Sequence, residues 1–190
     1  MKVTLEPTAL TDVVVVAPDS FQDERGFFVE VYRRDVFAEL GLPTEFVQLN
    51  HSRSARNVLR GLHFQWDPPM GKLMRVTQGR AFLAAVDIRH GSPTRGDWVG
   101  VTLDAADKKQ LWAPAGFARG FCVLSDYAEI EYLCTGTYSA AGESGVLWND
   151  PAIGIEWPIT DPILSAKDQN AQTLAEWFDR AESALFRYPG

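Results

Sequence analysis

The stretch VLRGLHFQ, residues 58–65, places an arginine and a histidine in a segment whose other residues predict a β-strand. Successive side chains of a regular strand point to opposite faces, so Arg60 and His63 would lie on different sides of the sheet. A β-bulge at Gly61 would change this parity. A histidine in such a strand serves as a hydrogen-bonded structural residue, a metal ligand or a general base.

Other predicted strands also carry polar side chains on faces that are otherwise apolar. In KLMRV, Lys72 alternates with Met74 and Val76. The same pattern holds for Glu30 in GFFVEVY, for Gln48 and Asn50 in FVQLN, and for Tyr132 in AEIEYLC. Buried polar groups are costly unless they are paired, so their recurrence in several strands indicates a β-barrel whose interior contains a site.

Taken alone, each of these residues also has a structural explanation. A strand histidine such as His63 is commonly hydrogen-bonded within a core, and Lys72 could extend its ammonium to water at a sheet edge. Asp168, in SAKDQN, lies where it would cap a following helix. Only the combination of these residues favours a functional site.

The histidine content argues against a metal site. His51, His63 and His90 lie in separate segments, and neither an H-x-H nor an H-E-x-x-H motif is present. A metal-dependent β-barrel enzyme often holds its ion through two or three histidines and a carboxylate. We therefore expect no bound metal.

The charge of the chain narrows the classes of ligand. The protein has 190 residues and a formal net charge of −7 at pH 7. It contains no run of Lys and Arg that could neutralise a row of phosphates, so we expect no binding to nucleic acid. A few arginines that converge in one cleft can still bind a small anion.

Cysteine usage and hydropathy predict a cytoplasmic protein. Cys122 and Cys134 lie in apolar strand-like segments, which predicts buried thiols in a reducing compartment, although a disulfide between them stays open. The N-terminal VVVV run lacks the basic flank and cleavage site of a signal peptide. No apolar stretch approaches the length of a membrane span, so we expect no membrane association.

Short strands and turns predict an all-β fold. Strand-like runs alternate with turn residues, and the long helices of a parallel α/β fold are missing. Many short strands at this spacing predict a β-sandwich or barrel. The runs cover residues 13–17, 26–32, 46–50, 58–64, 72–78, 81–89, 98–103, 109–114, 119–124 and 128–135.

Two helical segments accompany the strands. The first covers residues 35–40, with Asp35 as a candidate cap. The second covers about residues 171–185 and should pack on the β body through an apolar stripe formed by Leu174, Trp177, Phe178, Ala181 and Leu185. We predict a single domain over residues 1–190, with a β body to about residue 168 and a helical tail over about residues 169–190.

Together, these segments resemble the dTDP-4-dehydrorhamnose 3,5-epimerases, a family with a cupin-type jelly-roll fold. The matching motifs follow the family's order over about residues 20–168. They are DERGFFVE (23–30), FVQLNHSRS (46–54), LRGLHFQ (59–65), the KL of GKLMRV (71–76), VDIRHGSPTRGDW (86–98), QLWAPAGFARGF (110–121), VLSDYAEIEYLCTGTYS (123–139), WNDPAIGIEWP (148–158) and LSAKD (164–168).

The resemblance implies epimerisation at C3 and C5 of dTDP-4-dehydro-6-deoxy-D-glucose, giving dTDP-4-dehydro-L-rhamnose, without a metal or an organic cofactor. By position, His63 matches the general base, Asp168 its carboxylate partner and Tyr132 the proton donor. Lys72 matches a residue near the sugar carbonyl. The resemblance also implies a homodimer in which the N-terminal strands of one subunit complete the other's pocket. Substrate-binding positions match Arg25, Phe27, Glu30, Gln48, Asn50, Arg60, Tyr138, Glu143 and Lys167.

These residue types suit proton exchange next to a ketone. Epimerisation removes an α-proton and returns one to the opposite face, which requires a base, an acid and a group that stabilises the enolate oxygen. A histidine oriented by a carboxylate supplies the base, and a tyrosine, with an ordinary pKa of about 10, donates a proton. The ammonium of Lys72 can face the developing negative charge.

One motif departs from the family. The segment GFARGF carries Arg119 where the family has a histidine. Arginine cannot act as a base, but it can bind a phosphate or polarise an oxygen, so we assign Arg119 to substrate binding. The departure leaves open a 3-only or 5-only epimerase acting on a related nucleotide sugar. A non-catalytic cupin that binds sugar nucleotides and a metal-dependent cupin enzyme also stay open.

Overall fold

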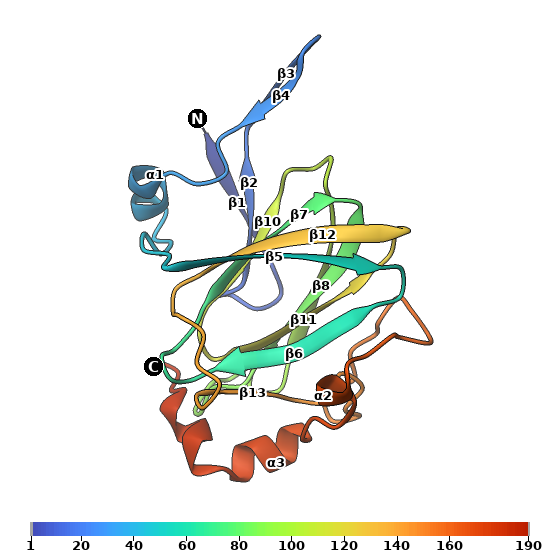
Figure 1. Cartoon of the computed structure of the whole chain (residues 1–190). Helices are drawn as coiled ribbons and strands as arrows, with labels where there is room; N and C mark the ends of the chain where they lie inside the picture. The colour runs from blue at the N-terminus through green and yellow to red at the C-terminus, as the bar shows by residue number, and fades with distance from the viewer. Residues whose placement is uncertain (1, 190) are drawn as a thin grey trace.

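Two antiparallel β-sheets that face each other form the body of the protein (Figure 1). The computed structural model describes residues 2–189. The larger sheet has six strands in the order β1 (Val3–Pro7), β2 (Val14–Pro18), β10 (Gln110–Ala113), β7 (Lys72–Gln78), β12 (Tyr127–Cys134) and β5 (Gln48–Ala55). The smaller sheet has five strands in the order β13 (Glu143–Gly145), β6 (Leu59–Gln65), β11 (Phe117–Val123), β8 (Arg80–Asp87) and β9 (Trp98–Asp104). This jelly roll confirms the predicted all-β fold class.

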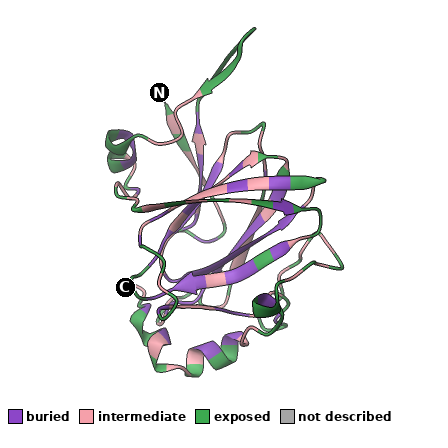
Figure 2. Ribbon diagram, viewed as in Figure 1, coloured by how far each residue is buried: buried purple, intermediate pink, exposed green. Residues whose placement is uncertain are grey.

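The ten predicted strand segments each overlap a strand of the structure. Three short strands were not predicted, namely β1, β13 and β3 (Ser20–Asp23). The predicted strand over residues 26–32 ends earlier, as β4 (Gly26–Val29). β3 and β4 pair only with each other and form a hairpin that extends away from the two sheets (Figure 1). Figure 2 shows this hairpin exposed along most of its length.

Apolar side chains fill three regions of the molecule. The largest cluster lies between the two sheets and includes Val76, Leu83 and Ile130. A second cluster joins the five-stranded sheet to the C-terminal segment, where Phe64 packs against Trp177 at 4.4 Å between ring centroids. The five-stranded sheet contributes to both clusters, because successive side chains of a strand point to opposite faces and both faces of this sheet are covered.

The first helix, α1 (Arg34–Glu39), lies close to its predicted position but has a different cap. Arg33 occupies the cap position, and its side chain makes no capping hydrogen bond. The prediction that Asp35 caps this helix is therefore wrong: Asp35 lies in the first turn, where it accepts a hydrogen bond from Arg33 Nε at 2.8 Å. The buried Phe37 anchors α1 to the third apolar cluster, which includes Trp112 of the six-stranded sheet.

The predicted helix over residues 171–185 is wrong, because the tail forms shorter segments. These are α2 (Ala166–Gln169), α3 (Leu174–Asp179) and the 3₁₀ helix η1 (Ala181–Leu185). Thr173 and Glu176 form a capping box that starts α3, and the extended backbone at Arg180 (φ −79°, ψ 142°) ends it. The break exposes Leu185 and lets Phe186 join the aromatic cluster in its place. Among residues 2–189, no helix has the length and hydropathy of a membrane span.

Candidate active site

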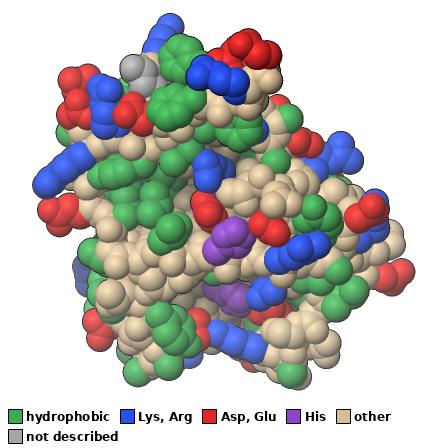
Figure 3. All heavy atoms as spheres, turned by 45° about the horizontal axis from the view of Figure 1, so that its top comes forward, with side chains coloured by type: hydrophobic (Ala, Val, Ile, Leu, Met, Phe, Trp, Pro, Cys, Tyr) green, Lys and Arg blue, Asp and Glu red, His purple; other side chains and the backbone are tan. Residues whose placement is uncertain are grey.

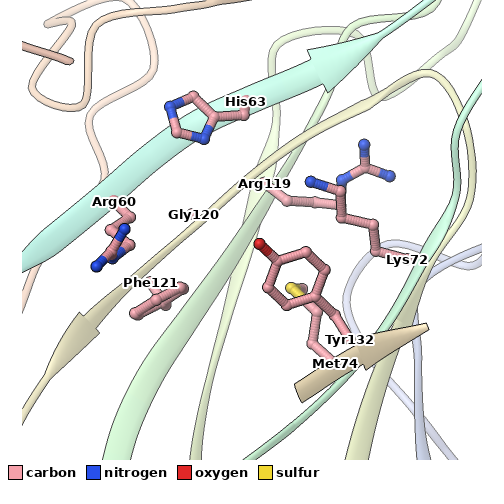
Figure 4. A pocket seen from close by; sticks show the side chains of 8 residues that line it. All are labelled: Arg60, His63, Lys72, Met74, Arg119, Gly120, Phe121 and Tyr132. Atoms are coloured by element: carbon pink, nitrogen blue, oxygen red, sulfur yellow. The ribbon is translucent and has the colours of Figure 1, made fainter. Parts of the chain in front are cut away.

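A cavity of about 480 Å³, including its open mouth, lies between the two sheets. Both sheets contribute to its lining (Figure 4). The five-stranded sheet supplies Arg60, His63, Arg119, Gly120 and Phe121, and the six-stranded sheet supplies Lys72, Met74 and Tyr132. Because three of these side chains are basic, the cavity suits an anionic ligand in spite of the net negative charge of the chain.

His63 and Asp168, which are 105 positions apart in the chain, form a hydrogen bond of 2.6 Å between Nε2 and Oδ1. Burial acts to raise the pKa of the Asp168 carboxyl, but hydrogen bonds from His63, Ser165 and the Gly61 backbone outweigh it, and the pKa lies below its usual value of 3.8. The carboxylate is therefore ionised at neutral pH and accepts a hydrogen bond from His63 Nε2–H. Nδ1 keeps its lone pair on the cavity side of the ring (Figure 4).

A β-bulge in β6 places Arg60 and His63 on the same side of the sheet. The register pairs His63 with Arg119 and Arg60 with Phe121, so β6 has one more residue than β11 between these pairs. Gly61 lies in this interval with a φ of +124°, a conformation that favours glycine. The bulge considered from the sequence is thus present, and it brings Arg60 into the cavity lining.

Lys72 and Tyr132 face His63 from the opposite sheet (Figure 4). Lys72 Nζ lies 5.0 Å from the centroid of the Tyr132 ring. Burial, followed by the positive charge of Arg119, lowers the pKa of Lys72 to about 8, so this side chain is mainly an ammonium at pH 7. Burial raises the pKa of Tyr132, so its hydroxyl keeps its proton at neutral pH.

Arg119 lies in the cavity wall with only 3% of its surface exposed. Its Nη1 donates to three backbone carbonyls, those of Met70 at 2.8 Å, Pro114 at 3.2 Å and Ala113 at 3.3 Å. Nε and Nη2 have no hydrogen-bond partner in the described part of the chain. Burial lowers the pKa of the guanidinium to about 10, which still leaves it cationic at neutral pH.

Three further predicted residues form a hydrogen-bonded group next to the His63–Asp168 pair. Glu143 accepts hydrogen bonds from the Tyr138 hydroxyl at 3.1 Å and from Lys167 Nζ. Lys167 borders two further pockets that flank His63 and Asp168. The group therefore lies beside the cavity and can contact the part of a ligand that extends out of it.

Gln48 and Asn50 lie on β5, at the edge of the six-stranded sheet. Gln48 Nε2 donates to Asn50 Oδ1 at 3.0 Å, and Gln48 Oε1 accepts from the Tyr138 backbone N–H at 2.8 Å. Asn50 is the cross-strand partner of Tyr132, and its Nδ2 donates to Cys134 Sγ at 3.8 Å. Gln48 thus connects the Tyr138 backbone to Asn50, which lies beside Tyr132.

Arg25, Phe27 and Glu30 do not reach this cavity within one chain. Arg25 and Phe27 lie on the β3–β4 hairpin, and Glu30 directly follows it. Arg25 pairs with Asp23 in the hairpin turn, and Phe27 lies under Lys108 Nζ, 3.6 Å from the ring centroid. None of the three lines the cavity, so the structure separates them from the other predicted site residues.

Sequence reasoning missed several supporting residues. Met74 and Phe121 line the cavity as apolar side chains on strands, and they carry no signal that separates them from core residues. Ser165 holds Asp168 in place: its Oγ accepts the Asp168 backbone N–H at 3.1 Å and donates to Oδ2 at 2.9 Å. The capping pattern Ser-x-x-Asp in SAKD could have identified it. Ser54, which accepts a hydrogen bond from Arg60, carried no such pattern.

The remaining histidines and the cysteines lie outside this arrangement. His51 contacts Glu129 at 3.0 Å on an exposed part of β5, and His90 contacts Ser183 at 3.0 Å. Within residues 2–189, no three His, Cys, Asp or Glu side chains come together as metal ligands would. Cys122 and Cys134 are buried free thiols, which agrees with the expectation of unpaired cysteines.

Residues 7–176 match the sequence model of the dTDP-4-dehydrorhamnose 3,5-epimerases. The chain belongs to this family. A dTDP-4-dehydrorhamnose 3,5-epimerase of Salmonella typhimurium is 55% identical over 170 residues, which cover 88% of this chain and 93% of that protein. A crystal structure from Legionella pneumophila, of a dTDP-6-deoxy-D-glucose-3,5-epimerase in complex with dTDP-4-keto-L-rhamnose, has a TM-score of 0.94 at 42% identity and covers both chains completely.

The family also has members with narrower activity. A dTDP-4-dehydrorhamnose 3-epimerase of Streptomyces niveus is 41% identical over 174 residues, covering 90% of this chain and 84% of that protein. The Salmonella 3,5-epimerase has a higher identity to this chain, over a similar part of it. Family membership thus identifies the class of enzyme, an epimerase of nucleotide sugars. The individual site residues bear on whether one or two carbons of the sugar are epimerised.

Proposed function

We propose that this protein epimerises C3 and C5 of dTDP-4-dehydro-6-deoxy-D-glucose and gives dTDP-4-dehydro-L-rhamnose. One observation carries the proposal: His63 on one sheet faces Tyr132 on the other sheet across a cavity, and Asp168 of α2 orients His63. A sugar ring between them would present one face to a base and the other to a proton donor. That is the arrangement that inversion of a carbon requires.

The steps follow from the protonation states of these groups. His63 Nδ1 removes the proton from the carbon next to the C4 ketone, and the electron pair of the broken C–H bond forms the enolate. The Tyr132 hydroxyl then protonates the same carbon from the opposite face. Exchange with solvent restores neutral His63 and the protonated tyrosine, and the cycle repeats at the second carbon. The substrate's own ketone acidifies both C–H bonds, so the proposal requires no cofactor.

Positive charge supports both binding and the transition state. We assign the Lys72 ammonium to the enolate oxygen, because it enters the cavity between the two proton-transfer groups (Figure 4). We assign Arg60 and Lys167 to the diphosphate, because both line a pocket that adjoins His63. Arginine and lysine bind phosphate oxygens through charge-assisted hydrogen bonds. Gln48, Asn50, Tyr138 and Glu143 would contact the nucleotide from the polar group beside the cavity.

We also propose a homodimer in which the β3–β4 hairpin reaches the partner's cavity. The hairpin exposes Phe21, Phe27 and Phe28 by 59%, 58% and 68%. Figure 3 shows hydrophobic side chains gathered with charged ones at the end of the molecule where this hairpin lies. Exposed aromatic groups of this kind mark an interaction surface, and a symmetric dimer would use two such arms. The two free cysteines support a reducing compartment, and we place the reaction in the cytoplasm.

Solvent exchange tests the reaction directly. In D₂O, the enzyme should place deuterium at C3 and at C5 of the substrate, as followed by ¹H NMR. His63→Asn should slow exchange at both carbons by about 10²–10⁴-fold while the protein stays folded, since it removes the general base. An absence of exchange at both carbons in the unmodified protein would refute the proposal, and an active His63→Asn variant would remove His63 from the role of base.

A 3-only or 5-only epimerase is the second candidate, because Arg119 replaces the family's usual histidine in the cavity wall. The same experiment separates the two candidates: deuterium at a single carbon, at saturating enzyme and long times, favours the narrower activity. A non-catalytic sugar-nucleotide-binding protein would bind dTDP and show no exchange.

A further inference from the structure

Arg119 is a buried cation without an anionic partner. Its guanidinium forms no ion pair with any carboxylate in residues 2–189, and only backbone carbonyls contact Nη1. Taking an unpaired charge out of water is costly, and proteins usually avoid it. The proposed proton transfers do not require Arg119. Its position in the wall of the cavity therefore calls for another role.

The hydrogen bonds of Arg119 fix the position of its charge. Nη1 donates to the carbonyls of Met70, Ala113 and Pro114, so the guanidinium cannot turn toward solvent without losing all three contacts. Lys72 enters the same cavity from the opposite sheet, and its two strand neighbours in register are Ala113 and Cys134. The Lys72 ammonium is flexible and the Arg119 guanidinium is held, so repulsion between them acts on Lys72.

Two of the other groups that face Lys72, Cys134 and Glu143, oppose this repulsion, but each has a smaller influence than Arg119. The titratable side chains that line the cavity or influence the charge of Lys72 are Arg60 and His63 of β6, Arg119 of β11, Tyr132 and Cys134 of β12, Glu143 of β13 and Lys167 of α2. The one carboxylate among them, Glu143, already pairs with Lys167. After burial, the charge of Arg119 is the largest influence that disfavours the ammonium form of Lys72.

We propose that Arg119 is a positioning residue that acts through Lys72. Its fixed charge directs the Lys72 ammonium toward the ketone oxygen of the bound sugar. With Arg119, the reaction rate falls at a lower pH on the alkaline side than it would with a neutral residue at this position. The inference rests on the proposed epimerase function for the identity of the oxygen. It concerns Arg119 alone and predicts a behaviour that family members with a neutral histidine here would not share.

The sign of the effect follows from the charges. Only the ammonium form of Lys72 stabilises a negative enolate oxygen, so the rate falls as pH rises through the pKa of Lys72, which lies at about 8. Without the neighbouring positive charge of Arg119, the ammonium form of Lys72 is more stable and the pKa of Lys72 rises. Replacing Arg119 by a neutral side chain should therefore move the alkaline limb of the rate profile to higher pH.

Titration of Lys72 tests the inference independently of activity. The chain has five lysines, so lysine labelled with ¹³C at Cε gives a small set of NMR signals, and the Lys72→Met spectrum assigns one of them to Lys72. We expect a midpoint near 8 in the unmodified protein. Arg119→Gln, which removes the charge and keeps a polar side chain, should raise the midpoint by about one pH unit. Arg80→Met, which removes an exposed charge at the far end of β7 and β8, should leave it unchanged.

Kinetics then connects the titration to the reaction. The alkaline limb of kcat for deuterium exchange should rise with the Lys72 midpoint in Arg119→Gln, and Arg119→His provides a second neutral variant if the first does not fold. A wild-type Lys72 midpoint near 10, or an unchanged midpoint in a folded Arg119 variant, would overturn the inference. If the unmodified protein shows the expected titration but no exchange at C3 or C5, the proposed function fails and the electrostatic coupling stands.

Discussion

At the scale of single residues, the site depends on a carboxylate that is kept ionised inside the protein. Asp168 is buried, and the hydrogen bonds that lower its pKa come from His63, Ser165 and the backbone of Gly61. This negative charge holds one tautomer of His63 and, in the proposed mechanism, would stabilise the imidazolium that proton abstraction creates. The histidine alone would have neither a fixed orientation nor this stabilisation.

Asp168→Asn should therefore lower kcat by at least about 100-fold, because the amide cannot stabilise the imidazolium. Solvent exchange at C3 and C5 measures the loss. Asp150→Asn is the matched control: Asp150 is also buried, its Oδ2 accepts the Leu174 backbone N–H at 2.6 Å, and it is not part of the cavity lining. If the two variants lose activity equally, the loss reflects the fold and not the base.

The same substitution has a pH signature in stability. A carboxyl whose folded pKa is depressed contributes stability above its unfolded pKa, and this contribution is lost as pH falls through the folded pKa. The pKa of Asp168 lies below its usual 3.8. The excess Tm of the unmodified protein over Asp168→Asn should therefore be largest near neutral pH and shrink as pH is lowered below about 4. Calorimetry over this range measures it, and a difference independent of pH would contradict the assignment.

At the scale of elements, the bulge in β6 decides which side chains enter the cavity. Gly61 allows the bulge because its φ is +124° and because a Cβ there would lie 2.6 Å from the Gly120 Cα of the neighbouring strand. Gly61→Ala should therefore destabilise the protein by about 2–4 kcal/mol, through backbone strain and the steric clash together. It should also weaken substrate binding, since Arg60 depends on the bulge for its direction.

Gly26→Ala provides a closely matched control. Gly26 has a φ of +121°, and a Cβ there would meet no atom within 4 Å. It should therefore cost only the backbone strain, about 1–2 kcal/mol. Chemical denaturation of the two variants measures the difference. Equal losses of stability would show that the contact between β6 and β11 tolerates a side chain.

The elements also show what could be predicted from the sequence. Short strand-like runs bounded by turn residues located all ten predicted strands. The apolar stripe with a 3.6-residue period predicted one long helix in the tail, and this prediction was wrong. The helix α3 begins after Thr173 and ends before Arg180, and Phe186 is buried where Leu185 was expected to be. The pattern of apolar residues within one segment predicts its secondary structure well. It does not determine where the chain changes direction so that an aromatic side chain, here Phe186, is buried.

Contacts between distant segments were inaccessible to pattern alone. The resemblance to a family suggested that His63 and Asp168 act together, and the structure brings them to 2.6 Å across 105 positions. Nothing in the sequence indicated that Arg119 would be buried without a carboxylate, because its surroundings come from Met70 and the segment around Pro114. Arg25 and Phe27 matched binding positions, yet one chain leaves them outside the cavity.

At the scale of the whole molecule, the separation of the hairpin from the cavity can be explained by exchange between two copies. Two variants test this by complementation. His63→Asn has an intact hairpin and an inactive cavity, whereas Arg25→Ala with Phe27→Ser has an intact cavity and an impaired hairpin. Each should be nearly inactive alone. In a symmetric dimer, random mixing after co-expression should restore up to about one quarter of the activity, because one cavity of each mixed dimer receives an intact His63 and an intact arm.

The recovered activity distinguishes an exchanged arm from an arm that folds back onto its own subunit. In the second case, every cavity in the mixture carries one defect, so mixing restores nothing. Light scattering supplies the control, since each variant alone and the mixture should have the mass of a dimer. A monomeric protein with full activity would contradict the proposal for the hairpin and leave the chemistry of the His63–Asp168 pair unaffected. The exposed aromatic side chains of the hairpin would then require a different partner.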